Sequence, residues 1–153
     1  MKFASYDIVF QEIPDEVTLA VNITNCPNRC KGCHSPHLQE DAGETLDENV
    51  LSAWLEKYGN AITCVCFMGG DAEPREVGKL ADFIRKKNGS VKTAWYSGRA
   101  ALPAGISPSN FDYIKLGAYI KELGGLNAPS TNQRFYRIEN GVMIDKTDGF
   151  RKN

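Results

Sequence analysis

The sequence lacks an excess of charge of either sign, and it lacks any long hydrophobic run. Lysine and arginine number 18 and aspartate and glutamate 19, so the formal net charge at pH 7 is −1. Proteins that bind nucleic acid through its phosphates usually carry a strongly basic surface. A membrane-spanning helix needs about 20 consecutive apolar residues, and no apolar stretch approaches that length. We therefore expect neither nucleic acid nor a membrane among the partners.

The N-terminal segment also lacks the pattern of a secretory signal peptide. Its single lysine is followed by acidic residues scattered among the apolar ones, in the stretch MKFASYDIVFQEIPDE. A signal peptide instead carries an uninterrupted apolar core. We expect the protein to be cytoplasmic, in a compartment where cysteine thiols stay reduced.

What the sequence does contain is typical of a globular protein. Of its 153 residues, 42% are hydrophobic and 24% are charged, both close to the usual values. A chain of this length can bury a hydrophobic core without disulfide bonds. The sequence predicts one domain that spans residues 1–153.

Strand patterns alternate with helix patterns along the chain. One helix is predicted to follow a capping box at 45–48 and to end near Lys57, and a second to begin at Pro74 and end at Gly89. This alternation predicts an α/β fold with a mostly parallel sheet. A complete eightfold barrel needs about 200 residues or more, so we expect a partial, open (β/α) barrel. The predicted strands are 17–23, 62–68, 91–96 and 113–116, with weaker strand patterns at 133–138 and 142–144.

Unusual residues follow three of the predicted strands. A cysteine cluster follows the first strand, Gly69 and Gly70 follow the second, and Ser97 and Gly98 follow the third. The carboxyl ends of parallel strands meet at one edge of a sheet, where ligands bind in such folds. The sequence therefore predicts that these residues lie together at one site.

The cysteine cluster has the spacing Cys26-x3-Cys30-x2-Cys33. Three thiolates on one short loop can bind three irons of a cubane cluster, whereas ordinary clusters of this kind use four cysteines. The fourth iron would then be open, and an open metal position is where substrate chemistry takes place.

The remaining two cysteines, Cys64 and Cys66, leave two interpretations open. They lie two residues apart on a predicted strand, so both side chains point to the same face. Buried cysteine is a common core residue. If either thiol were instead the fourth ligand, the cluster would lose its open iron and could only transfer electrons.

Two other metal sites compete with the cubane. Cys30, Cys33 and His34 match the C-x-x-C-H pattern of c-type haem attachment, but that pattern leaves Cys26 without a role. A zinc ion could use the three cysteines together with His34 or His37. Neither alternative is excluded by spacing alone.

The cysteine motif resembles that of the radical S-adenosylmethionine superfamily. The stretch KGCHSPHL, which contains Gly32, Cys33 and His34, is similar to the activating proteins of anaerobic ribonucleoside-triphosphate reductase. Three further stretches fit the same subgroup: FMGGD at 67–71, YSGR at 96–99 and STNQR at 130–134. The resemblance covers most of residues 17–137 and implies a partial barrel of the radical S-adenosylmethionine type.

The resemblance also implies two cofactors, a [4Fe-4S] cluster and S-adenosylmethionine. Cys26, Cys30 and Cys33 would hold the cluster, whose open iron would chelate the amino and carboxylate groups of S-adenosylmethionine. Either Asp71 or Glu73 would fill the acidic position after the glycine pair, and the roles of Arg99 and Arg134 stay open. The residues implied to lie against S-adenosylmethionine are Gly32, Cys33, His34, Gly69, Gly70 and Asp71.

The function implied is that of an enzyme, a glycyl-radical activase. It would cleave S-adenosylmethionine reductively to a 5′-deoxyadenosyl radical and install a glycyl radical on the large subunit of anaerobic ribonucleotide reductase. Its electrons would come from a flavodoxin- or ferredoxin-like donor. The alternatives are an activase of another glycyl-radical enzyme, a non-catalytic iron–sulfur electron carrier and a zinc-binding interaction module.

Overall fold

The computed structural model describes residues 1–30, 32–33 and 35–151. Its two α-helices are α1 (Glu48–Tyr58) and α2 (Pro74–Lys87), and short 3-10 helices span Pro36–Gln39, Pro108–Asn110 and Thr147–Phe150. Within the described residues no helix has the length and apolar character needed to cross a membrane. The strands are β1 (Lys2–Val9), β2 (Thr18–Ile23), β3 (Glu44–Thr45), β4 (Cys64–Met68), β5 (Lys92–Tyr96), β6 (Tyr113–Leu116), β7 (Arg134–Glu139) and β8 (Val142–Asp145).

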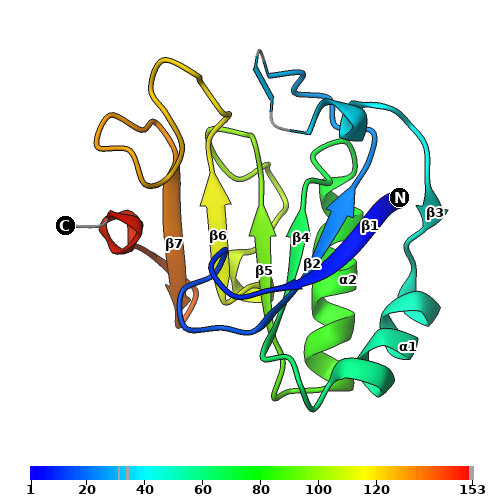
Figure 1. The fold of residues 1–153 in the computed structure, drawn as a ribbon. Coiled ribbons are helices and arrows are strands. Elements are labelled where there is room, and N and C mark those ends of the chain that lie inside the picture. Colours follow the sequence, from blue (N-terminus) through cyan, green and yellow to red (C-terminus); the bar gives the residue numbers. More distant parts are fainter. Residues whose placement is uncertain (31, 34, 152–153) are drawn as a thin grey trace.

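All these strands form one mixed sheet, with the order β3-β1-β2-β4-β5-β6-β7-β8 (Figure 1). The three central pairings, β2 with β4, β4 with β5 and β5 with β6, are parallel. The outer pairings on both sides are antiparallel. The parallel centre therefore brings the carboxyl ends of β2, β4, β5 and β6 to one edge of the sheet.

The prediction of a partial, open (β/α) barrel with a mostly parallel sheet is wrong. A barrel of this type needs a helix after each parallel strand, but in the described chain α-helices follow only β3 and β4. The connection from β5 to β6 contains a single 3-10 turn, and β6 continues into antiparallel β7 and β8. The result is one mixed sheet with two helices instead of a curved barrel wall.

The two helices cover one face of the sheet, where the larger part of the core lies (Figure 1). Val77, Leu80 and Ile84 of α2 are fully buried against this face, together with Phe67 and Trp95. Asp47 caps the N-terminus of α1, and its side chain accepts a hydrogen bond from the Val50 amide at 3.0 Å. This cap replaces the predicted capping box at 45–48, because Thr45 belongs to β3.

The opposite face of the sheet is covered by chain segments without α-helices. The segment between β1 and β2 crosses this face (Figure 1) and buries Ile13 against Cys64, Cys66 and Phe135. Cys64 and Cys66 alternate along β4 with Val65 and Phe67, which face the helices. The prediction that the two cysteines share one face is therefore confirmed.

Strand β1 has no counterpart in the sequence-based prediction. It pairs with β2 from Phe3 to Val9, with one irregularity between Phe3 and Ser5. Its Tyr6 ring lies 4.5 Å from that of Trp54 in α1, measured between centroids. The strand thus extends the sheet over α1 and supplies a wall for the first face of the core.

Candidate metal centre

Residues 24–43 form a loop that carries all three clustered cysteines and whose two ends are fixed to the same strand. At its start the Thr24 amide donates to the Lys2 carbonyl at 3.0 Å. At its end Glu44 pairs with Phe3 of β1. Inside the loop the Cys26 amide donates to the Leu38 carbonyl at 3.0 Å. We refer to residues 24–43 as the cysteine loop.

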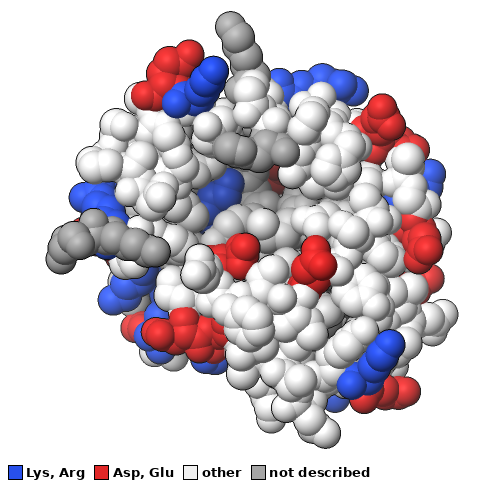
Figure 2. Space-filling view, viewed as in Figure 1, with Lys and Arg blue, Asp and Glu red and all other residues white. Residues whose placement is uncertain are grey.

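The cysteine loop closes one side of a cavity of about 490 Å³ at the carboxyl ends of the parallel strands. The face in Figure 2 is hollowed, and most of its charged side chains lie toward the margin. The three clustered cysteines therefore lie at the edge of the sheet where the sequence predicts a site. The residues that line the cavity include Cys26, Asn28, Cys30, Cys33, Gly69, Asp71, Gly98 and Lys115.

Two of the cysteine sulfurs accept hydrogen bonds within the loop. The side-chain amide of Asn28 donates to Cys26 Sγ at 3.6 Å, and the Ser35 amide donates to Cys33 Sγ at 3.4 Å. The Asn28 side chain and the loop backbone therefore hold two of the three sulfurs in place.

Asp71 is the most constrained charged residue of the cavity. Its side chain is 1% exposed and follows β4 directly after Gly69 and Gly70. Oδ1 accepts from Ser97 Oγ at 2.6 Å, and Oδ2 accepts from the Gly98 amide at 2.8 Å and from Asn28 Nδ2 at 2.5 Å. Asp71 thus ties the end of β4 to the end of β5 and to the cysteine loop.

Of the two candidate acids after the glycine pair, only Asp71 lines this cavity. Glu73 precedes the first turn of α2, and its carboxylate lies 3.4 Å from the Met1 amine. Most of the hydrogen-bonding capacity of Asp71 is used by Ser97, Gly98 and Asn28. Its main role in the structure is therefore to hold the loops that form the cavity.

The two glycines after β4 differ in what they face. Gly69 lines the cavity, and its carbonyl accepts a hydrogen bond from Trp95 Nε1 at 2.7 Å. Gly70 has a φ of +96°, and a Cβ atom there would lie 2.5 Å from Val77 Cγ2. Gly70 is therefore required by the packing of α2 against the strand end, and its missing side chain faces the core.

We expect Gly70→Ala to lower the free energy of unfolding of the metal-free protein by about 2–4 kcal/mol, because left-handed strain and overpacking add. Urea unfolding of both proteins measures the difference. Gly105→Ala is the matched control, since Gly105 also has a positive φ of +84° but a Cβ atom there would meet no other atom within 4 Å. This control should lose only about 1 kcal/mol. Equal losses of unfolding free energy in the two variants would contradict the proposed overlap of the added methyl group with Val77.

Lys115 on β6 places a buried cation in the cavity. The residue is 9% exposed, and its ammonium group donates to the Ser97 carbonyl at 3.1 Å and to the Gly117 carbonyl at 3.0 Å. Burial lowers the pKa of Lys115, while the negative groups of Asp71 and Cys30 act in the opposite direction. An ammonium group at this place favours an anionic ligand or a negatively charged metal cluster beside it.

Cys64 and Cys66 lie apart from this arrangement. Both side chains have 0% exposure and belong to the core on the second face of the sheet. Burial raises the pKa of both thiols, so the neutral form is favoured. Of the five cysteines in the chain, three line the cavity and two pack in the core.

This difference predicts two classes of thiol reactivity. In metal-free, reduced protein, Cys26, Cys30 and Cys33 should react readily with iodoacetamide, because they are partly exposed. Cys64 and Cys66 should react only after unfolding, because they are buried and their thiol pKa values are raised. A time course followed by mass spectrometry should show three fast additions and two slow ones, and five equal rates would contradict the assignment.

The other predicted site residues take several positions. Gly32 lies in the cysteine loop with a φ of +76°, and His34 lies outside the described residues. Arg99 donates from Nη2 to the Asp71 carbonyl at 2.8 Å, which makes it part of the cavity's support. Arg134 lies on β7 with its guanidinium 3.8 Å from the carboxylate of Asp145.

Lys115 and Asn28 are among the cavity residues that the sequence alone did not predict. Lys115 had a usable signal, because it is a charged residue inside the otherwise apolar strand pattern YIKL. Asn28 had none, because its importance depends on Asp71, which is 43 positions away in the chain.

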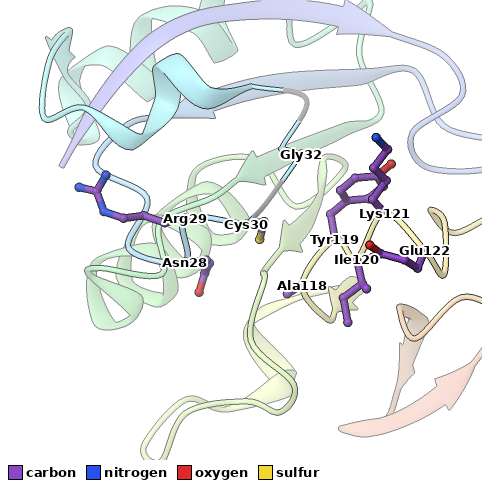
Figure 3. A pocket seen from close by; sticks show the side chains of 9 residues that line it. All are labelled: Asn28, Arg29, Cys30, Gly32, Ala118, Tyr119, Ile120, Lys121 and Glu122. Carbon is purple, nitrogen blue, oxygen red and sulfur yellow. The ribbon is translucent and has the colours of Figure 1, made fainter.

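A second cavity, of about 480 Å³, adjoins the first at Cys30 (Figure 3). The cysteine loop forms one wall of this second cavity, and the segment 118–122 after β6 forms the other. Ile120 in that segment is 40% exposed. Cys30 therefore lies where two cavities meet.

The donor set fits a [4Fe-4S] cluster. Among the described residues no three His, Cys, Asp or Glu side chains are close enough to share a single metal ion. A cubane makes a different demand, because each thiolate binds a different iron. Cys26, Cys30 and Cys33 line one cavity, two of their sulfurs accept N–H donors, and a buried ammonium lies in the same cavity.

Comparison with known proteins agrees with this donor set. Residues 16–101, a little more than half of the chain, match the family model described as a 4Fe-4S single cluster domain. No curated protein and no solved structure shows a significant match. The matched range contains the whole cysteine loop, the glycine pair, Asp71 and the end of β5. The chain therefore belongs to the family of 4Fe-4S single cluster domains.

Proposed function

We propose that this chain is a radical S-adenosylmethionine activase that installs a glycyl radical on anaerobic ribonucleotide reductase. The observation that carries the proposal is the division of the cysteines, with three lining the cavity and two buried in the core. Three cysteine ligands leave one iron of a cubane for an outside molecule. The resemblance of the cysteine motif and of the stretches at 67–71, 96–99 and 130–134 supports the choice of S-adenosylmethionine and of the reductase.

Cys26, Cys30 and Cys33 would hold the cluster, and S-adenosylmethionine would occupy the rest of the cavity. The cavity of about 490 Å³ lies within the range of about 300–1,000 Å³ that is usual for ligand sites. A bound, reduced cluster would supply one electron for cleavage of the sulfonium, and the radical so formed would remove a hydrogen atom from a glycine of the partner. An external flavodoxin- or ferredoxin-like protein would deliver that electron.

The residues of this chain bind and orient the reactants. The Lys115 ammonium would attract the carboxylate of S-adenosylmethionine, because charge-assisted hydrogen bonds are stronger than neutral ones and Lys115 is buried. Gly69 would let the end of β4 approach the methionine part, since it lines the cavity without a side chain. Asp71 would fix the surrounding loops through Ser97, Gly98 and Asn28.

The second cavity gives a protein substrate a place to approach the reacting centre. It opens between the cysteine loop and segment 118–122 and shares Asn28 and Cys30 with the first cavity. A segment of the reductase that entered it would come next to Cys30. The exposed Ile120 on its rim would contact such a segment.

Anaerobic reconstitution with iron and sulfide tests the proposal. The dithionite-reduced cluster should change its electron paramagnetic resonance spectrum when S-adenosylmethionine is added, and 5′-deoxyadenosine should form. Addition of the large reductase subunit should then give a glycyl-radical doublet. An unchanged spectrum and no 5′-deoxyadenosine would leave an electron carrier as the function, and bound zinc without iron would leave an interaction module.

A further inference from the structure

The side-chain amide of Asn28 connects a buried carboxylate with a cysteine sulfur. Its Nδ2 atom lies 2.5 Å from Asp71 Oδ2 and 3.6 Å from Cys26 Sγ. A primary amide nitrogen carries two N–H bonds, so one can be donated to each partner. Asn28 thus bonds both Asp71, which supports the cavity, and the sulfur of Cys26.

The surroundings of Asn28 are shaped to hold the amide in this place. A Cβ atom at Gly98 would lie 2.5 Å from Asn28 Nδ2, so the glycine at the end of β5 leaves the space that the amide occupies. The Gly98 backbone amide donates to the same Asp71 oxygen at 2.8 Å. Asp71 is itself held by Ser97 Oγ at 2.6 Å. The orientation of Asn28 is therefore fixed by the ends of two strands.

A hydrogen bond to a ligating sulfur has a known effect on an iron–sulfur cluster. Reduction adds negative charge, and an N–H donor stabilises that charge, so such bonds raise the reduction potential. Removing the donor makes the cluster harder to reduce. The carboxylate behind the amide determines which way the N–H groups point.

We propose that Asn28 is a positioning residue that raises the reduction potential of the cluster through its hydrogen bond to Cys26, with Asp71 and Gly98 holding it in place. The inference rests on a cluster at Cys26, Cys30 and Cys33, and it deepens the proposed function by adding control over the electron-transfer step. Gly98 at the end of β5 would thus influence the reduction potential of the cluster without being an iron ligand.

Asn28→Leu tests the proposal, because leucine has nearly the same shape as asparagine and no N–H group. The midpoint potential of the reconstituted cluster is measured by redox titration without S-adenosylmethionine. We expect the equilibrium constant for reduction to fall about tenfold, which is a shift of about 59 mV to more negative potential for one electron. Asn88→Leu is the control, since it removes the side-chain oxygen that accepts a hydrogen bond from the Ser90 amide beyond the end of α2, and it should leave the potential unchanged.

Gly98→Ala provides a second variant that leaves Asn28 and Asp71 chemically intact. Its methyl group should displace the Asn28 amide and shift the reduction potential in the same direction. The shift in the double variant should be close to the larger of the two single shifts, because both changes remove the same hydrogen bond. If Asn28→Leu fails to hold a cluster, Gly98→Ala decides the question. Wild-type potentials in the variants that load a cluster would overturn the proposal. Because S-adenosylmethionine is absent, the result stands apart from the test of the proposed function.

Discussion

Alanine in place of Cys26, Cys30 or Cys33 is expected to abolish both cluster binding and the proposed cleavage of S-adenosylmethionine. Each of these thiolates would hold a different iron, so the loss of one leaves a cubane with two protein ligands. Cleavage should fall roughly 10³-fold or more, which corresponds to about 4 kcal/mol of barrier. Iron and sulfide analysis after anaerobic reconstitution, together with chromatography of 5′-deoxyadenosine, measures both effects.

Cys64→Ala and Cys66→Ala are the matched controls for this experiment. Both thiols are buried on the second face of the sheet, so each change should cost about 1 kcal/mol of folding stability through a small cavity. Iron content and cleavage should remain near wild type. Loss of iron in either control would mean that a core thiol is a ligand, and retention of iron in any of the first three variants would remove that cysteine from the ligand set.

Asp71→Asn should have the second-largest effect, on both the stability and the geometry of the cavity. The carboxylate accepts from Ser97 Oγ, the Gly98 amide and Asn28 Nδ2. An asparagine at this position would point its own N–H groups at one or more of these donors and leave a buried donor without an acceptor. Because bonds to a charged group contribute about 1.5–3 kcal/mol each, we expect a loss of about 2–4 kcal/mol in the free energy of unfolding.

Chemical denaturation of the metal-free protein measures this loss independently of any cofactor. Asp82→Asn is the matched control, because Asp82 forms an exposed pair with Lys86 at 2.8 Å on α2. Such pairs contribute about 0.3–0.5 kcal/mol, so the control should remain close to wild type. An Asp71→Asn protein as stable as the Asp82→Asn protein would show that the carboxylate does not hold the cavity together.

The central part of the fold was predictable because its signals are local. The apolar strand patterns at 62–68 and 91–96 correspond to β4 and β5, and Pro74 does begin α2. Strand β1 was missed because its sequence contains no continuous apolar run. The strand is stabilised by its pairing with β2 and by the contact of Tyr6 with Trp54. The barrel prediction was wrong because the alternation of strands and helices, which occurs twice before Tyr96, does not continue after it. The described residues after Tyr96 form no α-helix.

The parts of the site that depend on residues close together in the sequence were predictable. The parts that depend on contacts between residues far apart in the sequence were not. The three clustered cysteines, Gly69 and Asp71 line one cavity, as expected from their places after strand ends. The core-facing role of Gly70 depends on Val77 of the following helix. The contact between Asn28 and Asp71 depends on how two loops meet in space, which no short-range pattern encodes.

The attachment of both ends of the cysteine loop to β1 has a consequence for the order of assembly. Since Thr24 bonds Lys2 and Glu44 pairs with Phe3, both ends of the twenty-residue cysteine loop are fixed to β1 of the folded sheet. Rearrangement of the thiolates around incoming iron is thereby confined to the loop and need not propagate into the strands. The polypeptide can therefore fold completely before it binds the iron–sulfur cluster.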